Sequence, residues 1–162
     1  MPEDRKEQGL ALTRSVQDNL LIAALGRLFP RAWFQPARAA RAAADSIERL
    51  HVRTSSPRQI VKLLSGGNQQ KVVIGKWLNA ASRVFICDEP TRGIDVGAKA
   101  EIFHLMETLV AEGAAVLMVS SELPEIVAMC DRAYVMRDKT IVAELSRDQL
   151  NEENILRLAM HS

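Results

Sequence analysis

The hydrophobic periodicity of the chain changes at Val84, and this change constrains the fold more than any other feature of the sequence. Between residues 10 and 64, apolar residues recur every three or four positions, as in amphipathic helices. From Val84 onward, short apolar runs alternate with longer helical patterns, which is typical of strand–helix–strand units in a parallel sheet. The sequence therefore predicts a wholly helical stretch over residues 10–64 and an α/β arrangement after it.

Capping and turn residues in the sequence predict where individual helices and strands begin and end. Ser15 and Asp18 form a capping-box pattern, and the helix after them is expected to end at about Phe29, before Pro30. An alanine-rich amphipathic helix is expected after Pro36. In the second part, the pattern predicts strands over residues 84–87, 115–119 and 133–136, helices over 98–111 and 123–130, a hairpin turn at 137–139, and a last helix capped by Asn151.

Composition excludes several classes of protein. The 162 residues carry a formal net charge of +1, so no bulk electrostatic field favours binding to nucleic acid or to an anionic surface. The longest apolar runs fall far short of the ~20 residues of a membrane-spanning helix. Cys87 and Cys130 show no paired spacing, which argues against a disulfide framework or a cysteine metal site and favours a reducing cytoplasm. The charged residues 1–9 lack the apolar core of a targeting segment.

Residues 64–71 read Leu-Ser-Gly-Gly-Asn-Gln-Gln-Lys at the predicted start of a helix. The two glycines would let a phosphate approach bare backbone N–H groups, and the positive end of the helix would point at that phosphate. Ser65 could add a hydroxyl donor. The alternative is that Ser65 only caps a helix after a glycine turn, and the length of the eight-residue motif favours the phosphate site.

The apolar strand at 84–87 ends in an acidic pair, Asp88 and Glu89. Open α/β sheets place their ligand sites at this end of their strands. Asp88 is expected to hold Mg²⁺ through a water, and Glu89 to polarise an attacking water in an in-line displacement. The alternative is an acidic pair that opens a solvated loop, which the following run Pro-Thr-Arg-Gly-Ile-Asp at 90–95 disfavours.

The glycine-rich loop closed by Gly-Lys-Ser/Thr, which commonly grips nucleotide phosphates, is absent from these 162 residues. Gly75 and Lys76 do not supply it, because Trp77 follows them and they lie inside a predicted helix. The three histidines have no ligand-like spacing and are expected to be structural or exposed; they are His51, His104 and His161.

Together these motifs resemble the nucleotide-binding domain of ABC transporter ATPases over almost the whole chain. Residues 64–71 are similar to the family signature, residues 84–89 to the Walker B strand with its catalytic carboxylate, and residues 93–95 to the loop that crosses the dimer interface. The runs Asp-Glu-Pro-Thr-Arg-Gly-Ile-Asp-Val-Gly-Ala-Lys and Val-Ser-Ser-Glu-Leu-Pro-Glu resemble the second ATPase half of tandem monosaccharide importers, the ribose, galactose and xylose type.

The resemblance implies an α/β fold, a partial P-loop NTPase domain with a helical subdomain and the C-terminal part of a mostly parallel sheet. It implies a remnant of the partner-sensing loop at 1–9, a helical subdomain at 10–82 and part of the ATPase core at 83–162. It also implies roles for individual residues: nucleotide contacts by Ser65, Gly66, Gly67 and Asn68, catalysis by Glu89, metal binding by Asp88, and a dimer-interface role for Asp95.

The function implied is that of an ATP-binding, ATP-hydrolysing subunit fragment of a carbohydrate importer, which offers its signature to a site completed by another half. The implied cofactors are ATP and Mg²⁺, and the implied partners are a second ATPase half and transmembrane permease subunits, with no nucleic acid. The expected location is the cytoplasm, at the inner face of the plasma membrane when assembled.

Two positions depart from the general family pattern. Ser121 stands where most members have a switch histidine, and Glu3 stands in the partner-sensing loop where glutamine is usual. Because the phosphate-gripping loop is missing, the chain is expected to be inactive alone. Two alternatives stay open: a non-catalytic relic or interaction module, and a soluble ABC ATPase without a transport role, which the importer-like motifs disfavour.

Overall fold

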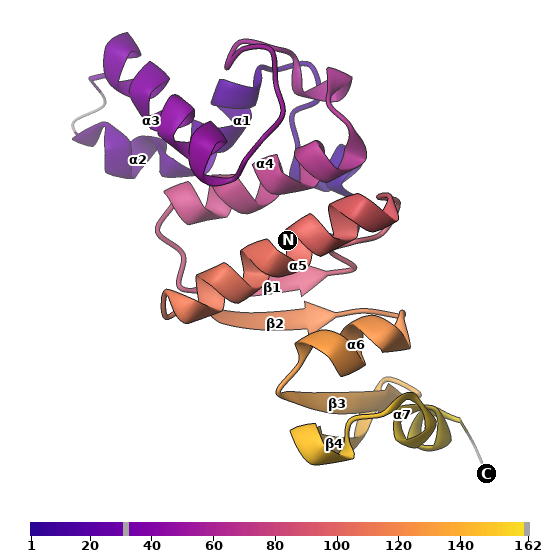
Figure 1. The fold of residues 1–162 in the computed structure, drawn as a ribbon. Coiled ribbons are helices and arrows are strands. Elements are labelled where there is room, and N and C mark those ends of the chain that lie inside the picture. The colour runs from indigo at the N-terminus through magenta and orange to yellow at the C-terminus, as the bar shows by residue number, and fades with distance from the viewer. Residues whose placement is uncertain (31–32, 161–162) are drawn as a thin grey trace. The chain divides into compact units, whose positions relative to one another are not determined.

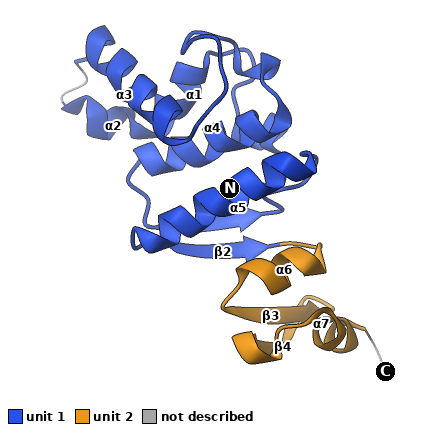
Figure 2. Ribbon diagram, viewed as in Figure 1, with its two compact units in different colours: residues 1–119 blue, residues 120–162 orange. Residues whose placement is uncertain are grey.

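The computed structural model describes residues 1–30 and 33–160 (Figure 1). Two compact units divide the chain, residues 1–119 and residues 120–162 (Figure 2). Because His161 lies outside the described residues, the expectation for it is not addressed by the structure. In the described part of the chain, no helix is both long and apolar enough to cross a membrane.

Helices dominate the beginning of the first unit, and seven precede the first strand in the described residues. They are η1 (Arg5–Gly9), α1 (Val16–Leu21), η2 (Ile22–Ala24), α2 (Leu25–Leu28), α3 (Pro36–Arg49), η4 (Val61–Leu63) and α4 (Gly66–Asn79).

The capping box at the start of α1 is confirmed, because the Ser15 hydroxyl accepts from the Asp18 N–H while the Asp18 carboxylate accepts from the Ser15 N–H. The helix after it is not continuous, since a 3₁₀ turn at Ile22–Ala24 separates α1 from α2. The prediction that residues 10–64 are wholly helical is wrong. The segment around Pro57 runs beside the entry to α1 instead, where Ser15 and Ile60 form an isolated antiparallel bridge.

Close approach of helices explains a glycine in the middle of α4. A Cβ on Gly75 would lie 2.4 Å from Leu50 Cδ1 and 2.6 Å from Leu20 Cδ2. These two leucines belong to the apolar core of the helical part, whose other fully buried members include Val16, Ala39, Ala43, Val61 and Val72. Gly75 lies inside a helix, as predicted, and its role there in packing is a finding of the structure.

A strand–helix–strand unit completes the first unit. It consists of β1 (Val84–Asp88), α5 (Val96–Ala111) and β2 (Ala115–Val119), and β1 pairs with β2 in parallel, as predicted. α5 covers one face of this pair (Figure 1). The buried contacts come from Ile102, Met106 and Leu109 on the helix and from Phe85 and Cys87 on β1.

The opposite face of the β1–β2 pair is uncovered within its unit. Its side chains alternate with the buried ones along each strand, and Ile86 lies directly opposite Leu117 in the register. The exposed fractions of the four large apolar side chains on this open sheet face are 63% for Val84, 56% for Ile86, 52% for Leu117 and 50% for Val119. A contiguous apolar surface of this kind is uncommon on a soluble monomer.

The second unit contains α6 (Leu123–Met129), β3 (Arg132–Arg137), β4 (Thr140–Ser146), η5 (Arg147–Gln149) and α7 (Glu152–Ala159). The predicted hairpin is confirmed, with Asp138 at φ +48° and Lys139 at φ +64° in its two-residue turn. Asn151 caps α7 by accepting from the Asn154 N–H, also as predicted. Among the described residues β2 pairs only with β1, and β3 only with β4, so the strands form one parallel and one antiparallel pair.

Candidate functional site

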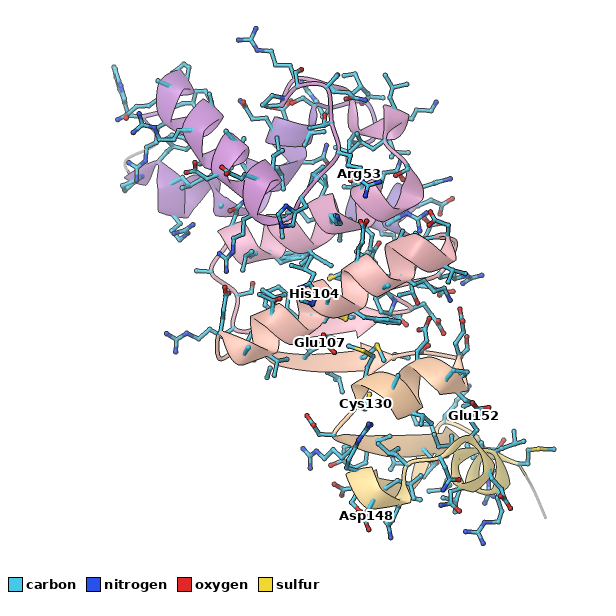
Figure 3. All side chains as sticks on the ribbon, in the orientation of Figure 1. Arg53, His104, Glu107, Cys130, Asp148 and Glu152 are labelled. Carbon is cyan, nitrogen blue, oxygen red and sulfur yellow. The ribbon has the colours of Figure 1, made fainter. Side chains whose placement is uncertain are left out.

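The first turn of α4 is open at its N-terminus. Ser65 occupies the N-cap position, but no side chain of the described chain caps the helix. The Ser65 hydroxyl instead accepts a hydrogen bond from Asn68 Nδ2 at 2.8 Å, and Asn68 Oδ1 accepts from the backbone N–H of Arg53 at 2.7 Å. Arg53, labelled in Figure 3, thus lies beside this turn. Asn68 holds Ser65 in place while the exposed hydroxyl keeps its donor capacity.

The two glycines of the turn are also required by packing, a reason that the sequence pattern did not reveal. A Cβ on Gly66 would lie 2.8 Å from Arg5 Nη2 and 3.2 Å from the Gly93 carbonyl oxygen. A Cβ on Gly67 would lie 2.5 Å from Ala98 Cβ, which is fixed to the backbone of α5 and cannot rotate away. In this arrangement Gly67 leaves no room for a Cβ, and a Cβ on Gly66 would require Arg5 and the Gly93 loop to shift, whether or not a phosphate binds.

Arg5 joins the N-terminal segment to the loop that follows β1. Its Nη1 donates to the Arg92 carbonyl oxygen at 2.7 Å, and its Nη2 donates to the Gly93 carbonyl oxygen at 3.1 Å. Burial lowers the pKa of Arg5 below its ordinary value, with the charge of Asp4 opposing that change. Glu3 forms an ion pair with Arg92 in the same loop. The segment that carries Glu3 is thus held against the loop by two separate contacts.

Asp88 and Glu89 lie at the carboxyl end of β1, as predicted. Glu89 has φ +46°, a left-handed conformation that costs a non-glycine residue roughly 1–2 kcal/mol. Two backbone bonds hold this conformation: the Glu89 N–H donates to the Val119 carbonyl at 2.9 Å, and the Glu89 carbonyl accepts from the Arg92 N–H at 3.1 Å. The carboxylate of Glu89 is therefore presented from a tight turn rather than from a relaxed strand end.

Asp95 has a structural role that the motif did not predict. Its Oδ1 accepts from the Ala98 N–H at 2.9 Å and so caps α5. The turn before it contains Gly93 at φ +68°, a conformation that favours glycine. Asp95 and Gly67 thus meet at the first turn of α5, where Ala98 contacts both.

A cluster of ion pairs connects α4 to α5 near the open turn. Lys71 is nearly buried, and its Nζ lies 2.8 Å from Glu101 Oε2 while donating to the His51 carbonyl at 3.0 Å. Arg53 Nη2 lies 3.0 Å from the other oxygen of Glu101. The hydrogen bond from Lys71 is the main reason that the pKa of Glu101 is lowered. Lys71, the last residue of the eight-residue motif, is therefore committed to holding the two helices together.

We expect this cluster to make the stability of the chain depend on pH. Because the folded pKa of Glu101 lies below its ordinary value, its contribution is complete above the ordinary glutamate range and is lost as pH falls through the lowered pKa. Glu101→Gln should therefore lower the melting temperature near neutral pH and have little effect in acid. Thermal melts of both proteins across this range measure the effect, with Glu107→Gln on the same helix as control. A difference between wild type and Glu101→Gln that persists unchanged in acid would contradict the assignment.

A basic hollow of about 350 Å³ lies beside the open turn. Three of its lining side chains are cationic, and none of its lining residues is acidic; the basic ones are Arg5, Lys6 and Lys62. Gly66 and Gly93 line its wall as well. The electrostatic surroundings of the turn therefore favour an anion.

The structure brings most of the predicted site residues into the first unit. Glu3, Gly66 and Asp95 are linked there through Arg5, the loop after β1 and the start of α5. Ser65 is connected through Asn68 to Arg53, which pairs with Glu101 on α5. Ser121 lies in the second unit and is exposed. In the same turn, Ser120 Oγ donates to Glu125 Oε2 at 2.9 Å and accepts from the Glu122 N–H at 3.1 Å.

Residues 5–92, which include the open turn and the acidic pair, match the family model described as ABC transporter. The chain belongs to the ABC transporter family. Solved structures support the same fold: an ATP-binding cassette of an ABC transporter aligns with a TM-score of 0.74 at 24% identity, covering 99% of this chain and 66% of that one. At this identity the likeness shows the fold alone.

Curated relatives are considerably more similar in sequence. A ribose import ATP-binding protein of Streptomyces coelicolor is 50% identical over 161 residues, which cover 99% of this chain and 31% of the relative. A protein of the same name from Burkholderia thailandensis is 49% identical, with 98% and 32% covered, and one from Geobacillus kaustophilus is 47% identical, with 97% and 32% covered. The chain therefore spans about a third of the length of the curated relatives that it matches.

Proposed function

We propose that this chain is the signature-bearing part of an ATP-hydrolysing subunit that drives carbohydrate import. The observation that carries the proposal is the uncapped first turn of α4, in which Ser65 is exposed and held by Asn68 while Gly66 and Gly67 add no side chain. Such a turn suits the terminal phosphate of a nucleotide held by another ATPase half. Similarity to ribose import ATP-binding proteins supports a sugar as the transported substrate.

The remaining site residues take roles that fit their positions. Glu89 orients the attacking water from the tight turn that follows β1. Asp95 lies at the interface with the second ATPase half while capping α5. Ser121 occupies the switch position in the second unit. Residues 10–82 act as the helical subdomain, and residues 83–162 belong to the ATPase core.

The protein supplies only some of the ligands that a magnesium ion needs, which is usual for this cation when it binds together with a nucleotide. In the described part of the chain, no group of three or more histidine, cysteine or acidic side chains could hold a metal. Mg²⁺ with a nucleotide is commonly held by one or two carboxylates plus the phosphates, so Asp88 at the end of β1 is sufficient as the protein's contribution. When bound with ATP, the ion would offset negative charge that develops on the phosphate oxygens.

Partners follow from the same proposal. Glu3 and its loop contact a transmembrane permease subunit, and its ion pair with Arg92 connects that contact to the loop behind β1. The assembled complex lies on the inner face of the plasma membrane, and sugar import depends on it. No nucleic acid takes part.

A chimera tests the proposal. In the Streptomyces coelicolor relative, the matched segment of 161 residues is replaced by this chain, and ATP hydrolysis is measured by phosphate release. We expect activity close to that of the relative. Ser65→Arg should reduce it by about a hundredfold or more, because the new side chain would occupy the approach of the phosphate and remove a hydroxyl donor.

Two further variants make the test discriminating. Glu89→Gln should abolish turnover while ATP still binds, and Ser55→Arg, in an exposed loop of the same helical part, should leave turnover unchanged. A correctly folded chimera that binds ATP but shows no turnover would favour the alternative of a non-catalytic relic. Turnover that Ser65→Arg leaves intact would contradict a role for the open turn.

A further inference from the structure

One segment of the first unit differs sharply in charge from the chain as a whole. Residues 19–44 contain no aspartate or glutamate but carry arginines at 27, 31, 38 and 41. The chain as a whole has a net charge of only +1, so this local excess is hidden in the total. Three of the few aromatic residues also fall here, Phe29, Trp33 and Phe34.

Four large apolar side chains of this segment are exposed. Trp33 is 76% exposed and Phe34 is 54% exposed, just before α3. On η2 and α2, Ile22 is 56% exposed and Leu25 is 41% exposed. Tryptophan with one apolar body and one polar N–H is the residue most suited to the boundary between water and lipid. We name the described residues of this stretch, 22–30 and 33–41, the arginine–aromatic segment.

The described arginines of this segment are exposed and carry no ion pair. Among residues 1–30 and 33–160, the ion pairs involve other side chains than Arg27, Arg38 and Arg41. The Arg38 guanidinium lies 6.0 Å from the centroid of the Phe29 ring, which in turn lies 4.9 Å from the Phe34 ring. The Arg38 guanidinium therefore lies beside an aromatic pair in which Phe29 is buried and Phe34 is exposed.

The start of α3 adds a second attraction for anions. Gln35 at the N-cap makes no side-chain cap, and Pro36 opens a helix of 14 residues. The free N–H groups of this first turn and the positive end of the helix lie in the same turn as Arg38. A phosphate oxygen near Arg38 would satisfy donors that the protein leaves open.

We propose that the arginine–aromatic segment binds directly to an anionic phospholipid bilayer. Trp33 and Phe34 enter the interfacial region, and the arginines contact headgroup phosphates. Nucleic acid suits the aromatic residues and arginines but not the exposed aliphatic side chains Ile22 and Leu25, which cannot stack on bases. This contact goes beyond the proposed function, because it needs no permease subunit and no nucleotide.

Vesicle flotation tests the proposal with the full chain, since bound protein rises with the vesicles while aggregates sink. We expect flotation with vesicles of equal parts phosphatidylglycerol and phosphatidylcholine, and none with phosphatidylcholine alone. Arg38→Gln and Arg41→Gln should each weaken binding about fivefold, the change that corresponds to about 1 kcal/mol per basic residue at a membrane surface. Arg58→Gln, which removes the same charge from an exposed loop, should have no effect.

A spectroscopic readout follows Trp33 itself. In a Trp77→Phe background, the emission of the remaining tryptophan should shift to shorter wavelength with the anionic vesicles, and Trp33→Ala should weaken flotation. Absence of flotation would overturn the proposal, as would equal losses in Arg38→Gln and Arg58→Gln or unshifted Trp33 emission. Binding of a single-stranded oligonucleotide in place of vesicles would also overturn it and assign the segment to nucleic acid.

Discussion

ATP hydrolysis by the purified chain alone is expected to fall below detection. Removal of a single preorganised donor to a reacting group commonly costs about a hundredfold in kcat. Here the whole glycine-rich loop with its lysine is absent from the 162 residues, so the phosphates have no grip beside Asp88 and Glu89. Phosphate release with Mg-ATP measures the result.

The Glu89→Gln variant is the control for this experiment. Traces of phosphate that are equal in wild type and Glu89→Gln come from contaminating enzymes. Turnover that disappears on Glu89→Gln would show that the chain builds a complete site without the loop, and that the expectation is wrong. If the chain alone is inactive and the chimera is active, the remainder of the relative supplies the missing phosphate-binding loop.

Self-association is the second large effect that we expect. The open sheet face exposes four large apolar side chains, and the outer edge of β2 has no strand partner among the described residues. The wild-type chain should therefore elute as oligomers or aggregate, with a broad melt. Size-exclusion chromatography with light scattering measures the distribution.

Charges on the open sheet face should reverse this behaviour. Ile86→Lys with Leu117→Glu places an opposite pair directly across the two strands, so the sheet itself is not penalised by repulsion. This double variant should be largely monomeric, while Val110→Lys, at an exposed apolar position on α5, should behave as wild type. A monodisperse wild-type monomer with a cooperative melt would refute the expectation.

Local chemistry allowed much of the fold to be predicted. The capping box at Ser15, the strands at β1 and β2, the hairpin at 138–139 and the cap at Asn151 all depend on residues within a few positions of one another. Such signals are readable in one sequence because the interacting groups are neighbours in the chain.

The incorrect or missed predictions concern contacts between residues that lie far apart in the sequence. The break at η2 and the extended path before α4 arise where distant segments meet, as in the bridge between Ser15 and Ile60. Arg5 contacts carbonyls 87 and 88 positions away, and Lys71 reaches Glu101 on another helix. The hydrophobic periodicity of a sequence does not predict contacts between such distant residues. The collision of a Gly67 side chain with Ala98 is likewise visible only in three dimensions.

The guanidinium of Arg5 connects residues 1–9 rigidly to the loop that follows β1. One planar group grips two consecutive carbonyl oxygens, so the loop cannot twist about one bond without breaking the other. A lysine, with its single ammonium on a flexible stem, would leave that rotation free. A molecule that pulled on Glu3 would consequently move residues 1–9 and the loop after β1 together. Through Arg5, this movement would reach the first turn of α4.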